Sequence, residues 1–276
     1  HRQGFFFIIV MKIAIIGFGN MGQTYANSFM SSGFVGASDI LILNKVAVEE
    51  KYSFGIDSAN FYTQPNPNIF ESDILILAVK PQDFKQLASE IKGFLNPEHV
   101  ILSVMAGISI EAMQKALSVA KIVRSMPNIP TQIGEGMTVF CASNSVDRKE
   151  LFIVQNLINT TGKSIYIEKE EMLNAATAVS GSGPAYVFYF MQAMIESAVK
   201  LGFSLSEAEF LVSQTFSGSV QLQNRSKLSN EAWIQRVASK GGTTEAALSV
   251  FNQKELQEIV IEGIEFANTR AIELGS

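Results

Sequence analysis

A short apolar run that leads directly into closely spaced glycines is the feature that most constrains this chain. Residues 12–16 are followed by Gly17, Gly19 and Gly22, which gives the spacing GxGxxG. This order predicts a strand, a tight turn and a helix whose first N–H groups face phosphates. It favours a dinucleotide site over a bare structural turn. The residues assigned to this site are Gly17, Phe18, Gly19, Asn20, Met21 and Gly22.

Composition excludes several classes of protein. The chain has 276 residues, of which 47% are hydrophobic and 17% charged, so it is long enough for a sizeable core and for two domains. A formal net charge of −5, with scattered Lys and Arg, gives no basic surface for nucleic acid, which is not an expected partner. The single cysteine, Cys141, cannot form an intramolecular disulfide. It is expected to be a small buried hydrophobe in a cytoplasmic protein.

Histidine is nearly absent, which narrows the chemistry. With only His1 and His99, there is little material for a histidine-centred triad, and no metal site is expected. His99 begins an expected strand, where a partly exposed structural role is predicted. Residues 1–10 precede Met11 and are interpreted as a leader left by expression or by an upstream start. The apolar run 5–16 is short and contains Lys12, so neither a transmembrane helix nor a secretory signal is expected.

Further apolar runs recur with helical patterns between them. Their continuous apolarity is typical of strands covered on both faces, as in a parallel sheet flanked by helices. The expected fold is therefore α/β, with a doubly wound (Rossmann) N-terminal domain. The runs are residues 39–43, 73–79, 99–103 and 121–124, and two more strands, 136–142 and 163–168, are expected to extend the same sheet on either side of a helix at 147–158.

From about Glu170 the strand-like runs disappear and helical patterns continue to the end. We therefore expect residues 11–168 to form a dinucleotide-binding domain and residues 169–276 an all-helical domain for substrate and dimerisation. The helical stretches are expected to break at residues 180–184, 202–204, 228–230 and 240–242.

The first long helix of this second domain predicts self-association. Pro184 fits a first helical turn, and residues 185–201 carry a single polar stripe of Gln192, Glu196 and Lys200. One stripe is too little for a helix that faces solvent on most sides. A homo-oligomer through the helical domain is expected, because a small domain has limited means to bury such a helix alone.

The residues after the second strand indicate which nucleotide is bound. An NAD site usually has an acidic side chain there to hold the ribose 2′-hydroxyl. This chain has Asn44 and Lys45 instead, an amide and a cation that suit a 2′-phosphate. NADP is therefore favoured, and the alternative is that Lys45 merely starts the next helix as a solvated residue.

Four further motifs lie where predicted strands or helices end, which is where open α/β folds place ligands. They are Ala-Val-Lys-Pro at 78–81, Arg-Ser-Met-Pro-Asn-Ile-Pro at 124–130, Ser-Gly-Ser-Gly-Pro at 180–184 and Ser-Lys-Gly-Gly-Thr-Thr at 239–244. Together with the glycine motif, they closely resemble the pyrroline-5-carboxylate reductase family, from Met11 essentially to the C-terminus. The resemblance implies NADPH-dependent reduction of the cyclic imine 1-pyrroline-5-carboxylate to L-proline. Such chemistry needs little general acid–base machinery, because the imine is readily protonated.

The resemblance also implies a substrate site. Thr244 corresponds to the threonine that hydrogen-bonds the substrate nitrogen, and a hydroxyl can serve both protonation states of the imine. The alternative for Thr244, and more so for Thr243, is a plain helix cap. Backbone N–H groups are expected to bind the substrate carboxylate at Gly241, Gly242 and Thr243, and a similar role is implied for Ser180, Gly181, Ser182 and Gly183.

On the cofactor side, the resemblance assigns residues 78–81 to the ribose and nicotinamide, and residues 126–128 to the nicotinamide pocket. Lys80 is either a proton donor, a cofactor contact or a solvated loop cation. An asparagine near the adenosine ribose maps only loosely to Asn66. The two segments are Ala78, Val79, Lys80 and Pro81, and Met126, Pro127 and Asn128.

The chain departs from the family pattern at Lys240, where many members have proline, and at residues 224–230, which lack an acidic residue that some members carry. One rival interpretation is a related NADP-dependent 3-hydroxyacid dehydrogenase or imine reductase. A hydroxyacid dehydrogenase would need a Lys or His base within residues 172–178, where only Asn174 and Thr177 are polar. A rival of another class is a non-catalytic NADP-binding sensor.

Overall fold

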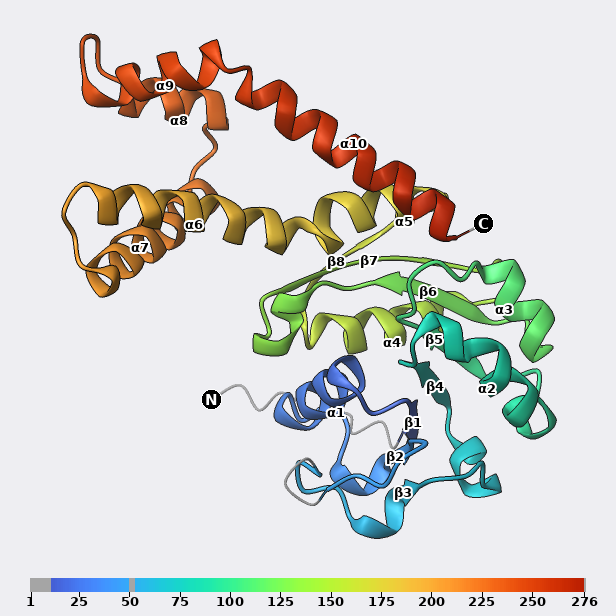
Figure 1. Cartoon of the computed structure of the whole chain (residues 1–276). Helices are drawn as coiled ribbons and strands as arrows, with labels where there is room; N and C mark the ends of the chain where they lie inside the picture. Colours follow the sequence, from blue (N-terminus) through green and yellow to red (C-terminus); the bar gives the residue numbers. More distant parts are fainter. Residues whose placement is uncertain (1–10, 50–52, 276) are drawn as a thin grey trace, which may run out of the picture. The chain divides into compact units, whose positions relative to one another are not determined.

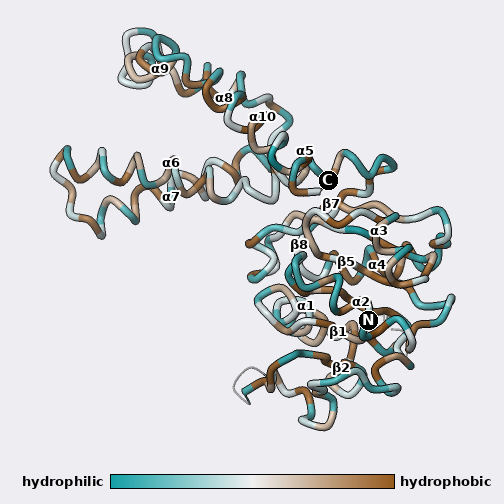
Figure 2. Tube along the Cα trace, turned by 45° about the vertical axis from the view of Figure 1, so that its right-hand side comes forward, coloured by the Kyte–Doolittle hydropathy of each residue, from teal (hydrophilic) through white to brown (hydrophobic). Residues whose placement is uncertain are grey.

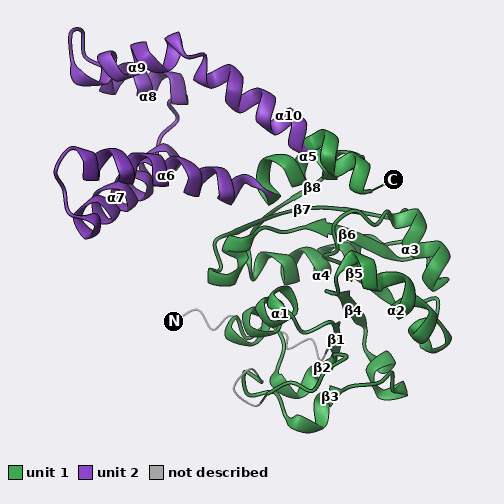
Figure 3. Ribbon diagram, viewed as in Figure 1, with its two compact units in different colours: residues 1–181, 268–276 green, residues 182–267 purple. Residues whose placement is uncertain are grey.

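The computed structural model describes residues 11–49 and 53–275, and the predicted leader 1–10 lies outside them. The chain divides into two compact units, one formed by residues 1–181 with 268–276 and the other by residues 182–267 (Figure 3). The short helix α5 (Met172–Ala176) belongs to the first unit, because it packs on strands of the sheet. The functional division after residue 168 stays a prediction.

Within the described residues, eight strands form one sheet in the order β3-β2-β1-β4-β5-β6-β7-β8 (Figure 1). All neighbours are parallel except β6 and β7, which are antiparallel. The strands are β1 (Ile13–Ile16), β2 (Ile40–Leu43), β3 (Phe61–Tyr62), β4 (Ile74–Leu77), β5 (Val100–Ser103), β6 (Ile122–Met126), β7 (Gly136–Ala142) and β8 (Gly162–Tyr166).

The continuous apolar runs form strands because both of their faces are covered. Every residue of β1, β2, β4 and β5 is buried. Odd-numbered β1 residues such as Ile13 pack in one core with α1 and α4, whereas Ala14 and Ile16 pack in a second core with α2 and α3. This confirms the doubly wound α/β fold. The helices are α1 (Asn20–Ser31), α2 (Phe84–Ile91), α3 (Ile110–Leu117) and α4 (Arg148–Asn159).

The second unit is helical, as predicted, and begins within the Ser-Gly-Ser-Gly-Pro motif. A π-helical turn, Thr177–Gly181, leads through Ser182 into α6, with Pro184 in its first turn. The break expected at residues 180–184 is therefore limited to Ser182, between the π-helical turn and α6. The helices are α6 (Gly183–Lys200), α7 (Leu205–Asn224), α8 (Asn230–Val237), α9 (Thr243–Gln253) and α10 (Leu256–Leu274), whose final residues from 268 on belong to the first unit.

Helix α6 exposes an apolar surface. None of its residues, all of which the structure describes, is buried, and Phe188 and Tyr189 are 62% and 76% exposed. Figure 2 marks hydrophobic residues along this unit as well as in the sheet. No helix of the described chain is long and apolar enough to cross a membrane.

The end of α10 contacts the loop after β5. Gly107 has a φ of +77°, and a Cβ added there would lie 2.9 Å from the Leu274 carbonyl oxygen. A side chain would therefore be excluded by both the backbone conformation and the close approach. The last residues of the chain thus form part of the first unit.

Candidate active site

A cavity of about 430 Å³ lies at the carboxyl ends of β1, β2 and β4. This is the edge where doubly wound sheets bind nucleotides. The predicted residues that line it are Gly17, Phe18, Gly19, Asn44, Lys45, Ala78, Val79 and Lys80. Its other lining residues are Ile16, Leu43, Thr63, Gln64, Pro65, Asp83, Gln86, Leu87 and Glu90.

The glycine turn has the geometry that its spacing predicts. Gly17 has a φ of +96°, and a Cβ there would lie 2.7 Å from the Ala78 carbonyl oxygen. A Cβ on Gly22 would overlap the Gly17 carbonyl, whereas a Cβ on Gly19 would meet nothing within 4 Å. The first and third glycines thus close the turn on the sheet, and the second leaves open space above it. That space, facing the first turn of α1, suits a pyrophosphate.

Asn44 is used to fix the glycine turn. Its Oδ1 accepts a hydrogen bond from the Phe18 N–H (3.0 Å), and its Nδ2 donates to the Val46 carbonyl (2.7 Å). The amide expected to bind a 2′-phosphate is therefore largely engaged within the chain. Lys45 next to it is exposed, and no helix begins within residues 45–49. The alternative in which Lys45 starts the next helix is wrong for these residues. Its exposed side chain lines this end of the cavity.

Asn66, which the sequence interpretation placed near the adenosine ribose, is not among the residues that line the cavity. This residue caps the 3-10 helix Pro67–Glu71 by accepting a hydrogen bond from the Asn68 N–H (3.0 Å). Thr63, Gln64 and Pro65 line the cavity instead. They follow β3, a strand of two residues that leaves no periodic signal in the sequence. The side chains from α2 were also missed, because only the fold brings that helix to the cavity.

Within the first unit, the predicted nicotinamide loop lies against the π-helical turn. Asn128 donates from Nδ2 to the Ser180 carbonyl (3.2 Å) and accepts at Oδ1 from the Met137 N–H (2.9 Å). A Cβ on Gly181 would come within 2.7 Å of the Met126 Cε atom. The structure therefore brings together two motifs that are far apart in the sequence, 126–128 and 180–181.

Ser180 has a buried hydroxyl without a hydrogen-bond partner among the described residues. Buried hydroxyls in folded proteins are almost always paired. An orphaned donor beside the loop that contains Met126 and Asn128 fits a site that takes a polar ligand. Asn20, Met21, Gly22, Pro81, Met126, Pro127 and Asn128 do not line the cavity.

The Gly-Gly-Thr-Thr motif lies at the start of α9 in the second unit. Thr243 and Thr244 are the first two helical residues, after Gly242 as the cap. Two of the amides expected to bind substrate already have partners, because Gly241 donates to Glu245 Oε2 (2.6 Å) and Gly242 to the Ser239 carbonyl (2.9 Å). Of the three amides, that of Thr243 has no hydrogen-bond partner among the residues that the structure describes.

Two residues considered for chemistry have structural roles. Cys141 is buried, and burial, followed by the charge of Glu170, raises its thiol pKa to about 12, so the expectation of an inert hydrophobe is confirmed. His99 is only 4% exposed, so the predicted partial exposure is wrong. Its ring pairs with the Asn96 N–H (3.0 Å) and the Phe70 carbonyl (2.8 Å), which satisfies both nitrogens inside the sheet edge.

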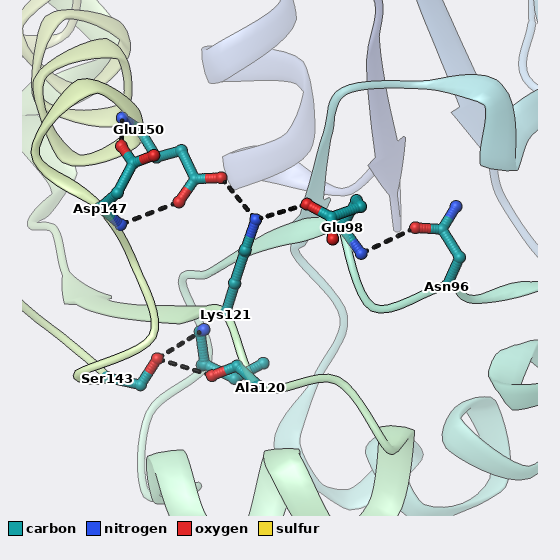
Figure 4. Close-up of polar contacts among 8 residues, drawn as sticks. Asn96, Glu98, Ala120, Lys121, Ser143, Asp147 and Glu150 are labelled. Carbon is teal, nitrogen blue, oxygen red and sulfur yellow. Dashed lines mark hydrogen bonds and ion pairs between the residues drawn. The ribbon is translucent and has the colours of Figure 1, made fainter.

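A second cavity, of about 600 Å³, lies at the amino ends of β1, β4 and β5. Beside it, Lys121 Nζ pairs with Glu98 Oε2 (2.8 Å) and Glu150 Oε1 (2.9 Å), while Glu150 also forms a capping box with Asp147 (Figure 4). These ion pairs join the starts of β5, β6 and α4. No cluster of three potential metal ligands occurs in the part of the chain that the structure describes.

The glycine turn, the doubly wound sheet and the helical unit define a Rossmann-type oxidoreductase. The model of the pyrroline-5-carboxylate reductase dimerisation family matches residues 170–274, and that of the coenzyme F420-dependent NADP oxidoreductases matches residues 12–107. The pyrroline-5-carboxylate reductase of Aquifex aeolicus is 32% identical over 97% of this chain and 98% of that protein. The chain belongs to the pyrroline-5-carboxylate reductase family.

Solved structures agree with this assignment. A pyrroline-5-carboxylate reductase from Coxiella burnetii has a TM-score of 0.88 and 31% identity, covering 97% of this chain and 99% of that one. The pyrroline carboxylate reductase of Plasmodium falciparum, solved with NADP bound, has a TM-score of 0.86 and 27% identity, covering 96% and 98%. The family resemblance read from the sequence motifs is confirmed.

Proposed function

We propose that this chain reduces 1-pyrroline-5-carboxylate to L-proline with NADPH. The observation that carries the proposal is full-length similarity: the Aquifex aeolicus reductase is matched over 97% of this chain at 32% identity. The cofactor supplies a hydride to the carbon of the protonated C=N bond, and the nitrogen keeps its proton, so the product is the secondary amine. The chain must therefore bind and orient both reactants rather than move protons extensively.

The first unit holds the cofactor in this proposal. The open space over Gly19 and the first turn of α1 would bind the pyrophosphate, and Lys45 would pair with the 2′-phosphate. Asn44 would act indirectly by fixing the glycine turn through Phe18. Met126, Pro127 and Asn128 would border the nicotinamide, with Ser180 behind them.

The second unit supplies the substrate contacts. The Thr244 hydroxyl would accept a hydrogen bond from the imine N–H. The backbone amides at the positive end of α9, that of Thr243 and that of Gly241, which is bonded to Glu245, would bind the carboxylate. Ser182 and Gly183 begin α6 and remain proposed contacts. In functional terms, we assign residues 11–168 to NADP binding and residues 169–276 to substrate binding and dimerisation.

The protein would act as a homo-oligomer in the cytoplasm. Residues 170–274 match the family's dimerisation model, and α6 in that region has an exposed apolar surface. Burial of this surface by a second copy would remove it from water. The buried free thiol of Cys141 suits a reducing compartment.

The test is NADPH oxidation with 1-pyrroline-5-carboxylate, compared with 3-oxo acids as substrates. We expect turnover of the imine, and a loss of about ten- to a thousand-fold in kcat/KM for Thr244→Ala, the range for one oriented hydrogen bond plus some positioning. Thr215→Ala is the control, because Thr215 is an exposed threonine of α7 whose hydroxyl donates to the Leu211 carbonyl of its own helix. Turnover of 3-oxo acids alone would favour the hydroxyacid dehydrogenase, and NADPH binding without turnover would favour the sensor.

A further inference from the structure

The loop before α9 already holds a carboxylate of the chain itself. Glu245, in the first turn of the helix, places Oε2 at 2.6 Å from the Gly241 nitrogen. Gly241 has a φ of +73°, a conformation that favours glycine, and its N–H donates to the Glu245 carboxylate. A short N–H···O contact to an ionised oxygen is a charge-assisted hydrogen bond, one of the stronger kinds in proteins. The anion-binding end of α9 is therefore partly occupied from within.

Glu245 faces the same positive groups that a bound carboxylate would use. The N-terminus of a helix carries partial positive charge from its unpaired N–H groups, and an acidic residue in the first turn partly neutralises it. The Gly241 N–H cannot donate fully to two carboxylates at once. A substrate carboxylate at this N–H would also lie beside the Glu245 carboxylate, and the two negative charges would repel each other. Because Gly241 and Glu245 are both exposed, a ligand from solution can reach the bond and displace it.

We propose that Glu245 is a specificity-determining residue that competes with the substrate carboxylate for the Gly241 amide and so weakens the binding of carboxylated imines. This inference rests on the proposed function, because it takes the substrate to carry a carboxylate to this loop. The product carries the same carboxylate, so Glu245 also weakens product binding. An imine without a carboxylate does not need this amide and is indifferent to Glu245.

The experiment compares two imines, 1-pyrroline-5-carboxylate and 1-pyrroline, which lacks the carboxylate. In Glu245→Gln the carboxamide oxygen can still accept from Gly241, but the negative charge is gone. We expect KM for 1-pyrroline-5-carboxylate to fall about three- to ten-fold at low salt, and KM for 1-pyrroline to stay within two-fold, as suits a charge at a helix terminus. The effect should shrink at high ionic strength, because the site is exposed.

Glu258→Gln is the matched control. Glu258 lies in the first turn of α10 and is also exposed, so the variant makes the same change of charge at another helix start. It should leave both KM values unchanged. If Glu258→Gln lowers KM as much as Glu245→Gln does, the effect is one of net charge and the proposal is overturned.

A purely structural helix cap makes a different prediction. In that case Glu245→Gln lowers the melting temperature and leaves the ratio of the two KM values unchanged, which overturns the proposal. Calorimetric titration of the NADP-loaded protein with L-proline separates this result from failure of the proposed function. If the wild type reduces neither imine, tighter proline binding by Glu245→Gln still supports competition at Gly241, and equal or absent binding overturns it.

Discussion

At the scale of single residues, the two neighbours Asn44 and Lys45 divide one predicted task between them. Both were expected to contact the 2′-phosphate. Asn44 is instead tied to the glycine turn and to Val46, while Lys45 is exposed at the cavity. The two side chains should therefore affect cofactor binding in different ways.

We expect Lys45→Ala to raise KM for NADPH about ten-fold and to leave KM for NADH unchanged, because the lost ion pair exists only with the 2′-phosphate. Asn44→Ala should raise both KM values, because the turn at Phe18 loses its anchor. Steady-state kinetics with the two cofactors check this pair. An equal effect of Lys45→Ala on NADH would contradict the assignment of Lys45.

The sequence could predict the geometry of the glycine turn from residue type and spacing, because that geometry depends on the local backbone. The roles of Thr243 and Thr244 stay predictions. The sequence could not show how amide groups are used. Asn44, Asn66 and Asn128 all looked like ligands, yet each forms hydrogen bonds that hold its own loop. A side chain's partners depend on the tertiary structure, and for that reason the sequence did not indicate the contact of Glu245 with Gly241.

At the scale of elements, Lys121 links the N-terminal ends of β5, β6 and α4 through its two ion pairs. The hydrogen bonds that Lys121 donates to Glu150 and then to Glu98 raise the Lys121 pKa, and the bond from Lys121 lowers the Glu98 pKa. Because its pKa is raised, Lys121 contributes stability to the fold at pH values below the ordinary lysine pKa of 10.5. This stability is lost as pH rises above that value. Because its pKa is lowered, Glu98 contributes stability to the fold at pH values above its ordinary pKa of 4.5. This stability is lost as pH falls below that value.

We expect Lys121→Met to lower the free energy of unfolding by about 1–2 kcal/mol at pH 7. The difference from wild type should shrink as pH falls below about 4.5, where Glu98 takes up its proton in the unfolded chain first. Urea denaturation at several pH values measures it, with Lys163→Met on the exposed part of β8 as the control. A loss that does not vary with pH would show that packing, and not charge, is responsible.

Seven of the strands could be predicted. Six of them contain apolar runs, whereas β8 mixes polar and apolar residues after a turn. The two residues of β3 are too few to produce a pattern. The reversed direction of β7 was also invisible, because an apolar run reads the same in either orientation. Direction depends on the path of the connecting chain, here the turn at residues 129–135.

At the scale of the whole molecule, the exposed apolar surface of α6 is the feature that most requires explanation. We expect Tyr189→Glu to dissociate the oligomer, because a buried carboxylate in an apolar interface has no partner. Lys200→Glu, on the polar stripe of the same helix, is the control and should leave the oligomer intact. Sedimentation velocity at micromolar concentration distinguishes them, and an unchanged mass for Tyr189→Glu would contradict the assignment of this face.

The return of α10 to the first unit affects how the chain is synthesised and folded. Residues 182–267 interrupt a unit that is completed only by residues from 268 on (Figure 3). During synthesis, the strands of the sheet therefore emerge well before the segment that completes their unit, including the approach of Leu274 to Gly107. Contacts of such large sequence separation slow folding, so the sheet should reach its full protection from hydrogen exchange only after residues 268–274 have left the ribosome.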